Sequence, residues 1–353
     1  MNHCSGGPAT DQFDMVTALV NSENEEATMT ISTRAAHALA AAFFCCAVLP
    51  APALAQQYPS KPVRVIVPFP AGGPADLVAR LLGAKLAEAW GQPVVIENRG
   101  GAGGNIGTAA VARSAPDGYT ILLTTSGFMC NPSLYKNIGY DPFKDFAPVT
   151  VAGNSATIVV RHPSLAGVNS MRDIEQLART SKVDFATPGI GLAGHLSGEL
   201  FKTLAKIDMQ PIPFAGAGPA IASVLSGQVK LGFMAVPSTL PHIKSGRLVA
   251  IAVTSPQRLA ALPEVPTVAE SGYPGFQVDN MYGVLAPHGT PPEVVKKLHD
   301  DIVRVLQRPD ARKVLEAASI DIVANTPEEF ARYIESEYTK WAQVVKASGT
   351  RVE

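Results

Sequence analysis

Short apolar runs alternate with segments of helical periodicity along most of the chain. Val63–Val67 is an apolar run of the kind found in buried parallel strands. A glycine turn follows, and then residues 75–90, in which leucine and valine recur at helical spacing. Two further strand-like runs, 94–96 and 119–124, enclose a short helix at 108–113. This βαβαβ order predicts a parallel sheet with right-handed crossovers.

The same alternation restarts after a strand expected near residues 157–161. Strands are predicted at 183–186, 210–214, 229–233 and 249–254, and helices at 170–179, 196–206 and 219–226. The chain therefore contains two βα halves, although their sequences show no detectable repeat.

The last part of the chain is predicted to be helical. Thr290 with Glu293, and Thr326 with Glu329, have the spacing of capping boxes, and each is expected to open an amphipathic helix. A short strand at 320–323 lies between them. The closing helix, 327–347, is expected to pack back on the first half and to make that half discontinuous in sequence.

Four glycine-rich turns are each placed where a strand should lead into a helix. They occupy residues 69–73, 100–107, 189–194 and 215–218. A helix N-terminus offers unpaired N–H groups with a positive dipole end, and glycine lets a ligand approach the backbone closely. Because two turns fall in each predicted half, the sequence predicts a small anionic ligand held between two lobes.

The N-terminal region has the pattern of an export signal. Arg34 precedes an apolar run at 35–49, and Ala53-Leu54-Ala55 supplies a small-x-small cleavage site. We expect a signal peptide at 29–55 and a periplasmic protein. Residues 1–28 hold five acidic and no basic residues, the wrong flank for export. They are interpreted as a misassigned start, with a genuine extension as the alternative.

Cleavage after Ala55 changes what the composition implies. It leaves a small positive charge excess without a cluster of lysine or arginine, which argues against a nucleic-acid partner. Cys130 is then the one remaining cysteine, so no internal disulfide is expected. We expect Cys130 to be a small buried residue rather than a nucleophile.

The chain contains a literal match to the dinucleotide-binding fingerprint. Gly189, Gly191 and Gly194 have its spacing, and Asp208 lies about 20 residues further on. The acidic residue should end the next strand, whereas Asp208 precedes the strand expected at 210–214. A dinucleotide-dependent enzyme is therefore kept only as an alternative, and no cofactor is expected.

Titratable residues near the glycine turns have more than one interpretation. The histidines have no metal-ligand spacing, so no metal is expected. His195, at a glycine-rich helix start, could line the pocket, cap the helix or act as a base. Asp76 could complement the helix dipole or organise its loop by accepting backbone N–H groups. Arg99 could neutralise an anion or form a surface ion pair.

Ten segments in order along the chain resemble one family of receptors. They are residues 58–62, 67–76, 95–107, 115–119, 131–135, 140–142, 195–201, 216–220, 262–267 and 286–291. Their combination resembles the Bug family, the extracytoplasmic substrate-binding receptors of tripartite tricarboxylate transporters.

This resemblance implies the α/β fold of a two-lobed periplasmic binding protein (type II-like). Each lobe would be a mainly parallel sheet flanked by helices, with the ligand in the interlobe cleft. Lobe 1 would comprise 56–160 plus 279–353, and lobe 2 would comprise 161–278. Strands crossing near Val160 and Asp279 would join the lobes. The expected function is to capture a small carboxylate and deliver it to membrane transporter subunits, as a monomer and not as an enzyme.

The resemblance also implies which residues bind the ligand. From the first lobe they are Phe69, Ala71, Gly72, Gly73, Asp76, Asn105, Ser126 and Gly127. From the second lobe and its boundary they are Gly189, Gly191, His195, Ala215, Gly216 and Asp279. Ala75, Gly127, Phe128 and Met281 replace polar or larger residues common in similar proteins. We therefore expect the distal pocket to accept an apolar or aromatic acid more readily than citrate.

A receptor that signals to a membrane sensor is the main functional alternative. It would bind its ligand in the same way and would differ only in its membrane partner.

Export gives the first testable prediction. If residues 29–55 are a cleaved signal, intact-mass analysis of the secreted protein will show Gln56 as its first residue. A mature species that retains residues before Met29 would contradict this prediction.

Overall fold

The structure is a computed structural model that describes residues 58–349. The predicted signal peptide and its cleavage site lie outside the described residues. Within them, no helix combines the length and the hydropathy needed to cross a membrane.

The first group of elements, called the β1 group, runs from β1 (Val63–Val67) to α4 (Gly127–Leu134) and begins with the predicted βαβαβ unit. Strands β1 (Val63–Val67), β2 (Val94–Asn98) and β3 (Thr120–Thr124) pair in parallel in the order β2-β1-β3. Helices α2 (Pro74–Trp90) and α3 (Asn105–Ala112) connect them, and a 3-10 turn at Ala102–Gly104 precedes α3. The predicted parallel unit is confirmed, with α3 beginning earlier than expected.

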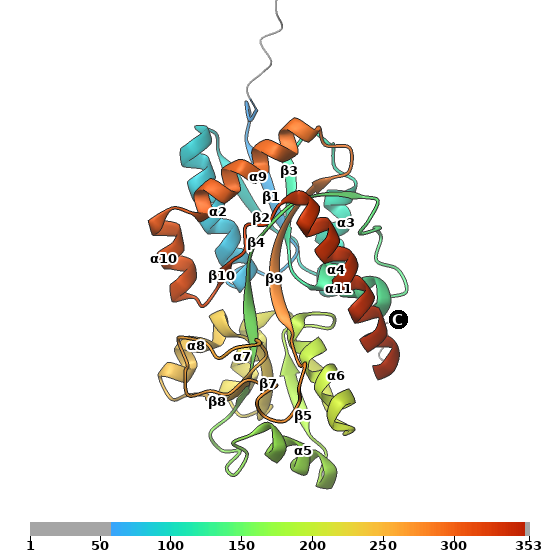
Figure 1. Cartoon of the computed structure of the whole chain (residues 1–353), viewed down its shortest axis with the longest axis vertical. Helices are drawn as coiled ribbons and strands as arrows, with labels where there is room; N and C mark the ends of the chain where they lie inside the picture. The colour runs from blue at the N-terminus through green and yellow to red at the C-terminus, as the bar shows by residue number, and fades with distance from the viewer. Residues whose placement is uncertain (1–57, 350–353) are drawn as a thin grey trace, which may run out of the picture. The chain divides into compact units, whose positions relative to one another are not determined.

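The second group, called the β5 group, contains the second set of βα units (Figure 1). Its strands are β5 (Asp184–Thr187), β6 (Gln210–Pro213), β7 (Leu231–Ala235) and β8 (Val249–Val253). Its helices are α5 (Met171–Thr180), α6 (Ala193–Ala205), α7 (Ala217–Leu225) and α8 (Val236–Lys244). Strand β5 pairs in parallel with β6 and with β7, as the alternation of strands and helices predicts.

Two antiparallel strands, β4 (Phe146–Arg161) and β9 (Asp279–Pro287), join the groups (Figure 1). Strand β4 pairs with β9 from Phe146 to Ala156, and with β7 from Thr157 onward. The α/β prediction is confirmed, but the sheet is mixed, because β4 and β9 pair antiparallel with each of their neighbours. The partner change and the start of β9 lie close to the expected lobe boundaries, and the division into lobes stays a prediction.

The C-terminal elements are α9 (Pro292–Leu306), α10 (Pro309–Ala317), β10 (Asp321–Ile322) and α11 (Pro327–Ser348). The capping box at Thr326 and Glu329 is present, with both reciprocal hydrogen bonds. The box predicted at Thr290 and Glu293 is wrong. The Thr290 hydroxyl donates to the carbonyl of Pro287 at 2.7 Å, and α9 takes Pro291 as its N-cap.

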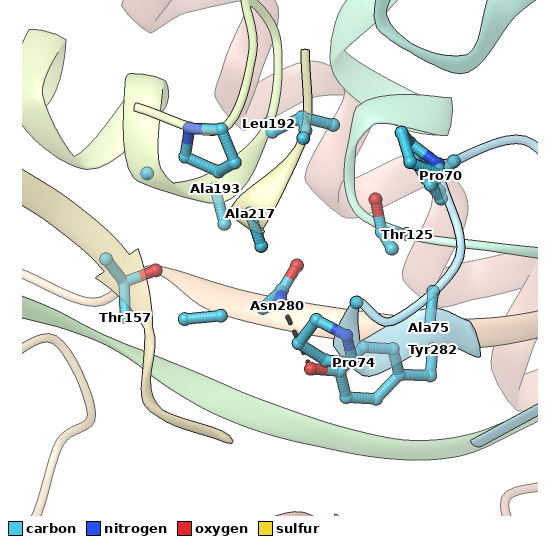
Figure 2. A pocket seen from close by; sticks show the side chains of 16 residues that line it. Pro70, Pro74, Ala75, Thr125, Thr157, Leu192, Ala193, Ala217, Asn280 and Tyr282 are labelled. Carbon is cyan, nitrogen blue, oxygen red and sulfur yellow. Dashed lines mark hydrogen bonds between the residues drawn. The ribbon is translucent and has the colours of Figure 1, made fainter. Parts of the chain in front are cut away.

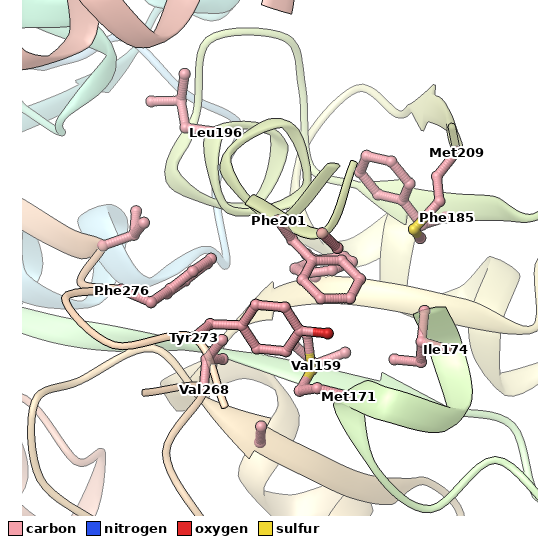
Figure 3. Packing of buried hydrophobic residues seen from close by; sticks show 14 of the residues in the cluster. Val159, Met171, Ile174, Phe185, Leu196, Phe201, Met209, Val268, Tyr273 and Phe276 are labelled. Atoms are coloured by element: carbon pink, nitrogen blue, oxygen red, sulfur yellow. The ribbon is translucent and has the colours of Figure 1, made fainter. Parts of the chain in front are cut away.

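Helix α11 packs on both groups. Phe330 and Ile334 belong to a buried cluster with Phe128 of α4 (Gly127–Leu134), in the β1 group. Further along, Trp341 and Val345 join the core of the β5 group, which contains the α6 side chains Leu196 and Phe201 (Figure 3). The expected packing of this helix on the first half is confirmed for its first turns, and its last turns contact the β5 group as well.

Helices α4 and α8 were absent from the sequence prediction. Each has a proline inside it, Pro132 and Pro241 respectively, and proline is ordinarily a signal against a helix interior. Cys130 lies on α4 and is a buried free thiol, as expected. Burial raises its pKa well above the ordinary value.

Candidate ligand-binding site

Several helices begin at one small cavity between the two groups. The N-cap or first residue of α2, α6, α7 and α8 lies on its wall, at Gly73, Leu192, Gly216 and Ala235 respectively. Thr125, next to the N-cap of α4, lies there too. The first backbone N–H groups of a helix have no intrahelical partner and carry partial positive charge. The cavity is therefore surrounded by groups that attract an anion.

The central strands supply three polar side chains of the cavity, from Thr157 on β4 and from Asn280 and Tyr282 on β9, and Thr125 supplies a fourth (Figure 2). The remaining wall is mostly apolar, with Phe69, Pro70 and other small or apolar residues. None of the described residues that line it carries a charged side chain. Its volume is about 70 Å³, several times the space that one water molecule needs. The helix ends are therefore its source of positive potential.

A larger cavity of about 370 Å³ adjoins the first and shares Phe69, Pro70, Leu192 and Gly216 with it. We call it the outer cavity. The glycine turn at 100–104 lines one side, and residues 188–190 and 213–216 line the other. The two sides come so close that a Cβ added at Gly103 would lie 2.9 Å from the carbonyl oxygen of Ile190. The glycine turns of the two groups therefore face one another, as the sequence predicts.

Asp76 organises the first glycine turn. Its carboxylate accepts hydrogen bonds from the Gly72 N–H at 2.9 Å, from Arg80 Nε at 2.8 Å and from Asn98 Nδ2 at 3.0 Å. Burial by itself raises the pKa of Asp76, but the bonds from Arg80, Gly72 and Asn98 outweigh it, so the net pKa lies below the ordinary value. Of the two interpretations, the loop organiser is the one that the contacts support.

His195 occupies the equivalent place beneath the third glycine turn. It is buried, and its Nδ1 accepts a hydrogen bond from the Gly191 N–H at 3.4 Å. Burial, and then the charge of Lys202, lower the pKa of His195 to about 4. The imidazole is therefore neutral near pH 7 and acts as an acceptor for the turn.

Three other predicted residues make contacts behind the cavity. Asn105 is buried, and its Oδ1 accepts from Asn131 Nδ2 at 2.7 Å. The Ser126 hydroxyl donates to the carbonyl of Asp279 at 2.8 Å and accepts from the Met281 N–H at 3.0 Å. These bonds hold the start of α4 against β9.

The predicted ligand-binding residues divide into those that line a cavity or groove and those that do not. Phe69, Gly73 and Gly216 line the small cavity, Gly189 and Ala215 line the outer cavity, and Gly72 lines a groove beside α7 and α8. The others line none of these spaces: Ala71, Asp76, Asn105, Ser126, Gly127, Gly191, His195 and Asp279. Whether each touches the ligand stays a prediction. Arg99 pairs with Glu97, in keeping with the surface ion pair.

The sequence interpretation missed some lining residues within the glycine turns themselves, such as Ala193 and Ala217, and most of the strand residues. The glycine turns were the sequence signal that could have located these residues, because a helix begins at each turn. Phe128 and Met281, expected at the distal wall, belong instead to a buried core cluster. Successive strand residues point to opposite faces, so Asn280 and Tyr282 face the cavity whereas Met281 faces the core.

Comparison with known proteins identifies the family. The model described as "Tripartite tricarboxylate transporter family receptor" matches residues 78–350. The chain belongs to this receptor family. BugT of Bordetella pertussis is 38% identical to it over 314 residues, which cover 88% of this chain and 96% of BugT.

Two solved structures of similar proteins contain a bound carboxylate. Rpa4515 of R. palustris, solved with adipate, is 33% identical, and the match covers 83% of this chain and 99% of that one with a TM-score of 0.79. MatC of Rhodopseudomonas palustris, solved with malate, is 32% identical, with coverage of 82% and 100% and a TM-score of 0.77. The family prediction and the fold class are confirmed, and the chain is a solute-binding receptor of this family.

The role of Asp76 can be tested with the isosteric variant Asp76→Asn. Loss of the charged acceptor should lower the free energy of unfolding at pH 7 by about 1.5–3 kcal/mol. The pKa of Asp76 is lower in the folded protein than in the unfolded chain. The extra stability that the carboxylate gives the wild-type protein is therefore present above the unfolded-state pKa and is lost as the pH falls through the folded-state pKa. Urea titrations at pH 7 and in acid should show a shrinking difference between the two proteins. A difference independent of pH would contradict this assignment.

Gly191 can be tested against a matched control, Gly246. Both residues have positive φ, +81° and +71° respectively, so alanine at either should cost about 1–2 kcal/mol in backbone strain. A Cβ at Gly191 would in addition overlap Asn131 Oδ1, whereas the one at Gly246 meets nothing within 4 Å. We expect both variants to fold and only Gly191→Ala to lose the increase in Tm that a bound carboxylate causes. Equal increases in the two variants would contradict this expectation.

Proposed function

We propose that this receptor binds a carboxylate with one or two carboxyl groups in the small cavity and delivers it to membrane transporter subunits. The observation that carries the proposal is the convergence of helix N-termini on a cavity without a charged side chain among its described lining residues. Backbone N–H groups at helix ends bind anions without a dedicated arginine.

The charge of the ligand follows from the same geometry. Each helix end contributes only about half of an elementary positive charge, and the contribution fades within the first turn. One carboxylate can be surrounded by several such ends. A tricarboxylate would place further charge against apolar residues such as Phe69 and Leu192, where its desolvation would not be compensated. The malate and adipate bound to the two similar receptors each fall within the proposed class.

Ligand capture is proposed to involve closure of the two groups about β4 and β9. The facing glycine turns lie on opposite sides of the outer cavity, and β4 changes its pairing partner at Ala156 and Thr157. A change in the angle between the groups at this point would open or close both cavities together, and hinge closure is a common way to enclose a solute.

The ligand class can be tested by thermal melting of the mature protein with a panel of compounds. At about 100 times its dissociation constant, a ligand adds about 2.7 kcal/mol of stability, which raises the Tm measurably. We expect mono- and dicarboxylates to raise the Tm more than citrate does. Stabilisation by sugars or cationic amines alone would contradict the carboxylate assignment, whereas preference for citrate would contradict only the limit on charge.

A further inference from the structure

The floor of the small cavity holds an amide that is hydrogen-bonded to a buried tyrosine. Asn280 Nδ2 donates to the Tyr282 hydroxyl at 3.2 Å, and this hydroxyl lies 2.7 Å from the Ser155 hydroxyl on β4. Tyr282 is fully buried, so the chain of hydrogen bonds is rigidly placed. With Nδ2 engaged there, the Oδ1 atom of Asn280 is turned toward the middle of the cavity (Figure 2).

Thr157 is a second polar residue in the lining of the same cavity. Its side chain is fully buried, and its Oγ1 has no hydrogen-bond partner within the described part of the chain. The Thr157 N–H donates to Thr254 Oγ1 at 2.9 Å, and the Thr157 carbonyl accepts from the Thr254 N–H at 2.9 Å. The side chain of Thr157 lines the cavity. A buried hydroxyl without a partner is costly, so the ligand is the natural source of the missing hydrogen bond.

The two atoms together define the ligand group that would suit them. An amide oxygen only accepts hydrogen bonds, whereas a hydroxyl both donates and accepts. A carboxylate oxygen cannot donate to Asn280. A ligand hydroxyl can donate to Asn280 Oδ1 while it accepts from Thr157 Oγ1. An ammonium group could also donate, but no carboxylate lines the described cavity to balance its charge, and the surrounding helix ends are positive.

We propose that Asn280 and Thr157 determine specificity by selecting a hydroxycarboxylate, a carboxylic acid that carries a hydroxyl group. This inference rests on the proposed function, since the carboxyl group is held by the helix N-termini of the same cavity. The hydroxyl is recognised at the floor formed by β4 and β9, and the carboxylate at the helix ends around it. An analogue without the hydroxyl offers no partner to Asn280 Oδ1 and Thr157 Oγ1, which is how such sites reject it.

The test compares acids that differ by one hydroxyl: malate with succinate, 3-hydroxybutyrate with butyrate, and mandelate with phenylacetate. Calorimetric titration of the mature wild-type protein should show at least one pair in which the hydroxy acid binds tenfold or more tightly. In Asn280→Leu and Thr157→Val, which nearly preserve side-chain volume, this ratio should fall below about threefold. Thr203→Val removes a hydroxyl that donates to the Glu199 carbonyl at 2.9 Å within α6 and does not line the cavity, so this variant should keep the ratio. Melting curves of the unliganded variants establish that each is folded.

The outcomes separate this inference from the proposed function. If no carboxylate in the panel binds to the wild-type protein, the proposed function fails. If carboxylates bind but no hydroxy acid is preferred, the proposed function stands and the hydroxyl selection is wrong. A preference that survives in both folded variants, Asn280→Leu and Thr157→Val, would overturn the assignment to these two residues.

Discussion

The convergence of helix N-termini on one small cavity is the constraint on which the site depends. Helices α2, α6, α7 and α8 come from both groups of elements, yet each begins at the same space. Their N-terminal dipole ends would repel one another if nothing negative lay between them. An anion relieves this repulsion and pairs N–H groups that have no intrahelical partner. Under the proposed function, an anion in this space would favour the approach of the two groups.

Two of the four glycine turns are held by buried side chains beneath them that accept their backbone N–H groups. Asp76 does so for Gly72, and His195 does so for Gly191. One acceptor is charged and the other is neutral, because Arg80 and Asn98 compensate the burial of Asp76, whereas the proton-bound form of His195 is disfavoured by its burial. Neither side chain lines the two cavities, and each contacts its turn through a backbone N–H group.

Strands β4 and β9 serve two purposes through the alternation of their side chains. Asn280 and Tyr282 form part of the cavity, and Met281 between them packs in the core. The same strands carry the sheet from one group to the other, with the change of partner at Ala156 and Thr157. Thr157, which lines the cavity, therefore also lies at the junction of the groups. Helix α11 spans the junction as well, since Phe330 packs on one side and Trp341 on the other.

The sequence by itself determined most of the order of strands and helices, the parallel pairing within the predicted βα units, and the glycine turns. These features follow from local periodicity and from residues that are close along the chain. The tertiary structure alone decided that β4 and β9 make the sheet mixed, that α11 packs on both groups, and which face of β9 lines the cavity. Each of these depends on contacts between residues distant in sequence. Phe128 and Met281 illustrate the reason: both are apolar residues near the site, and only packing distinguishes a core position from a cavity wall.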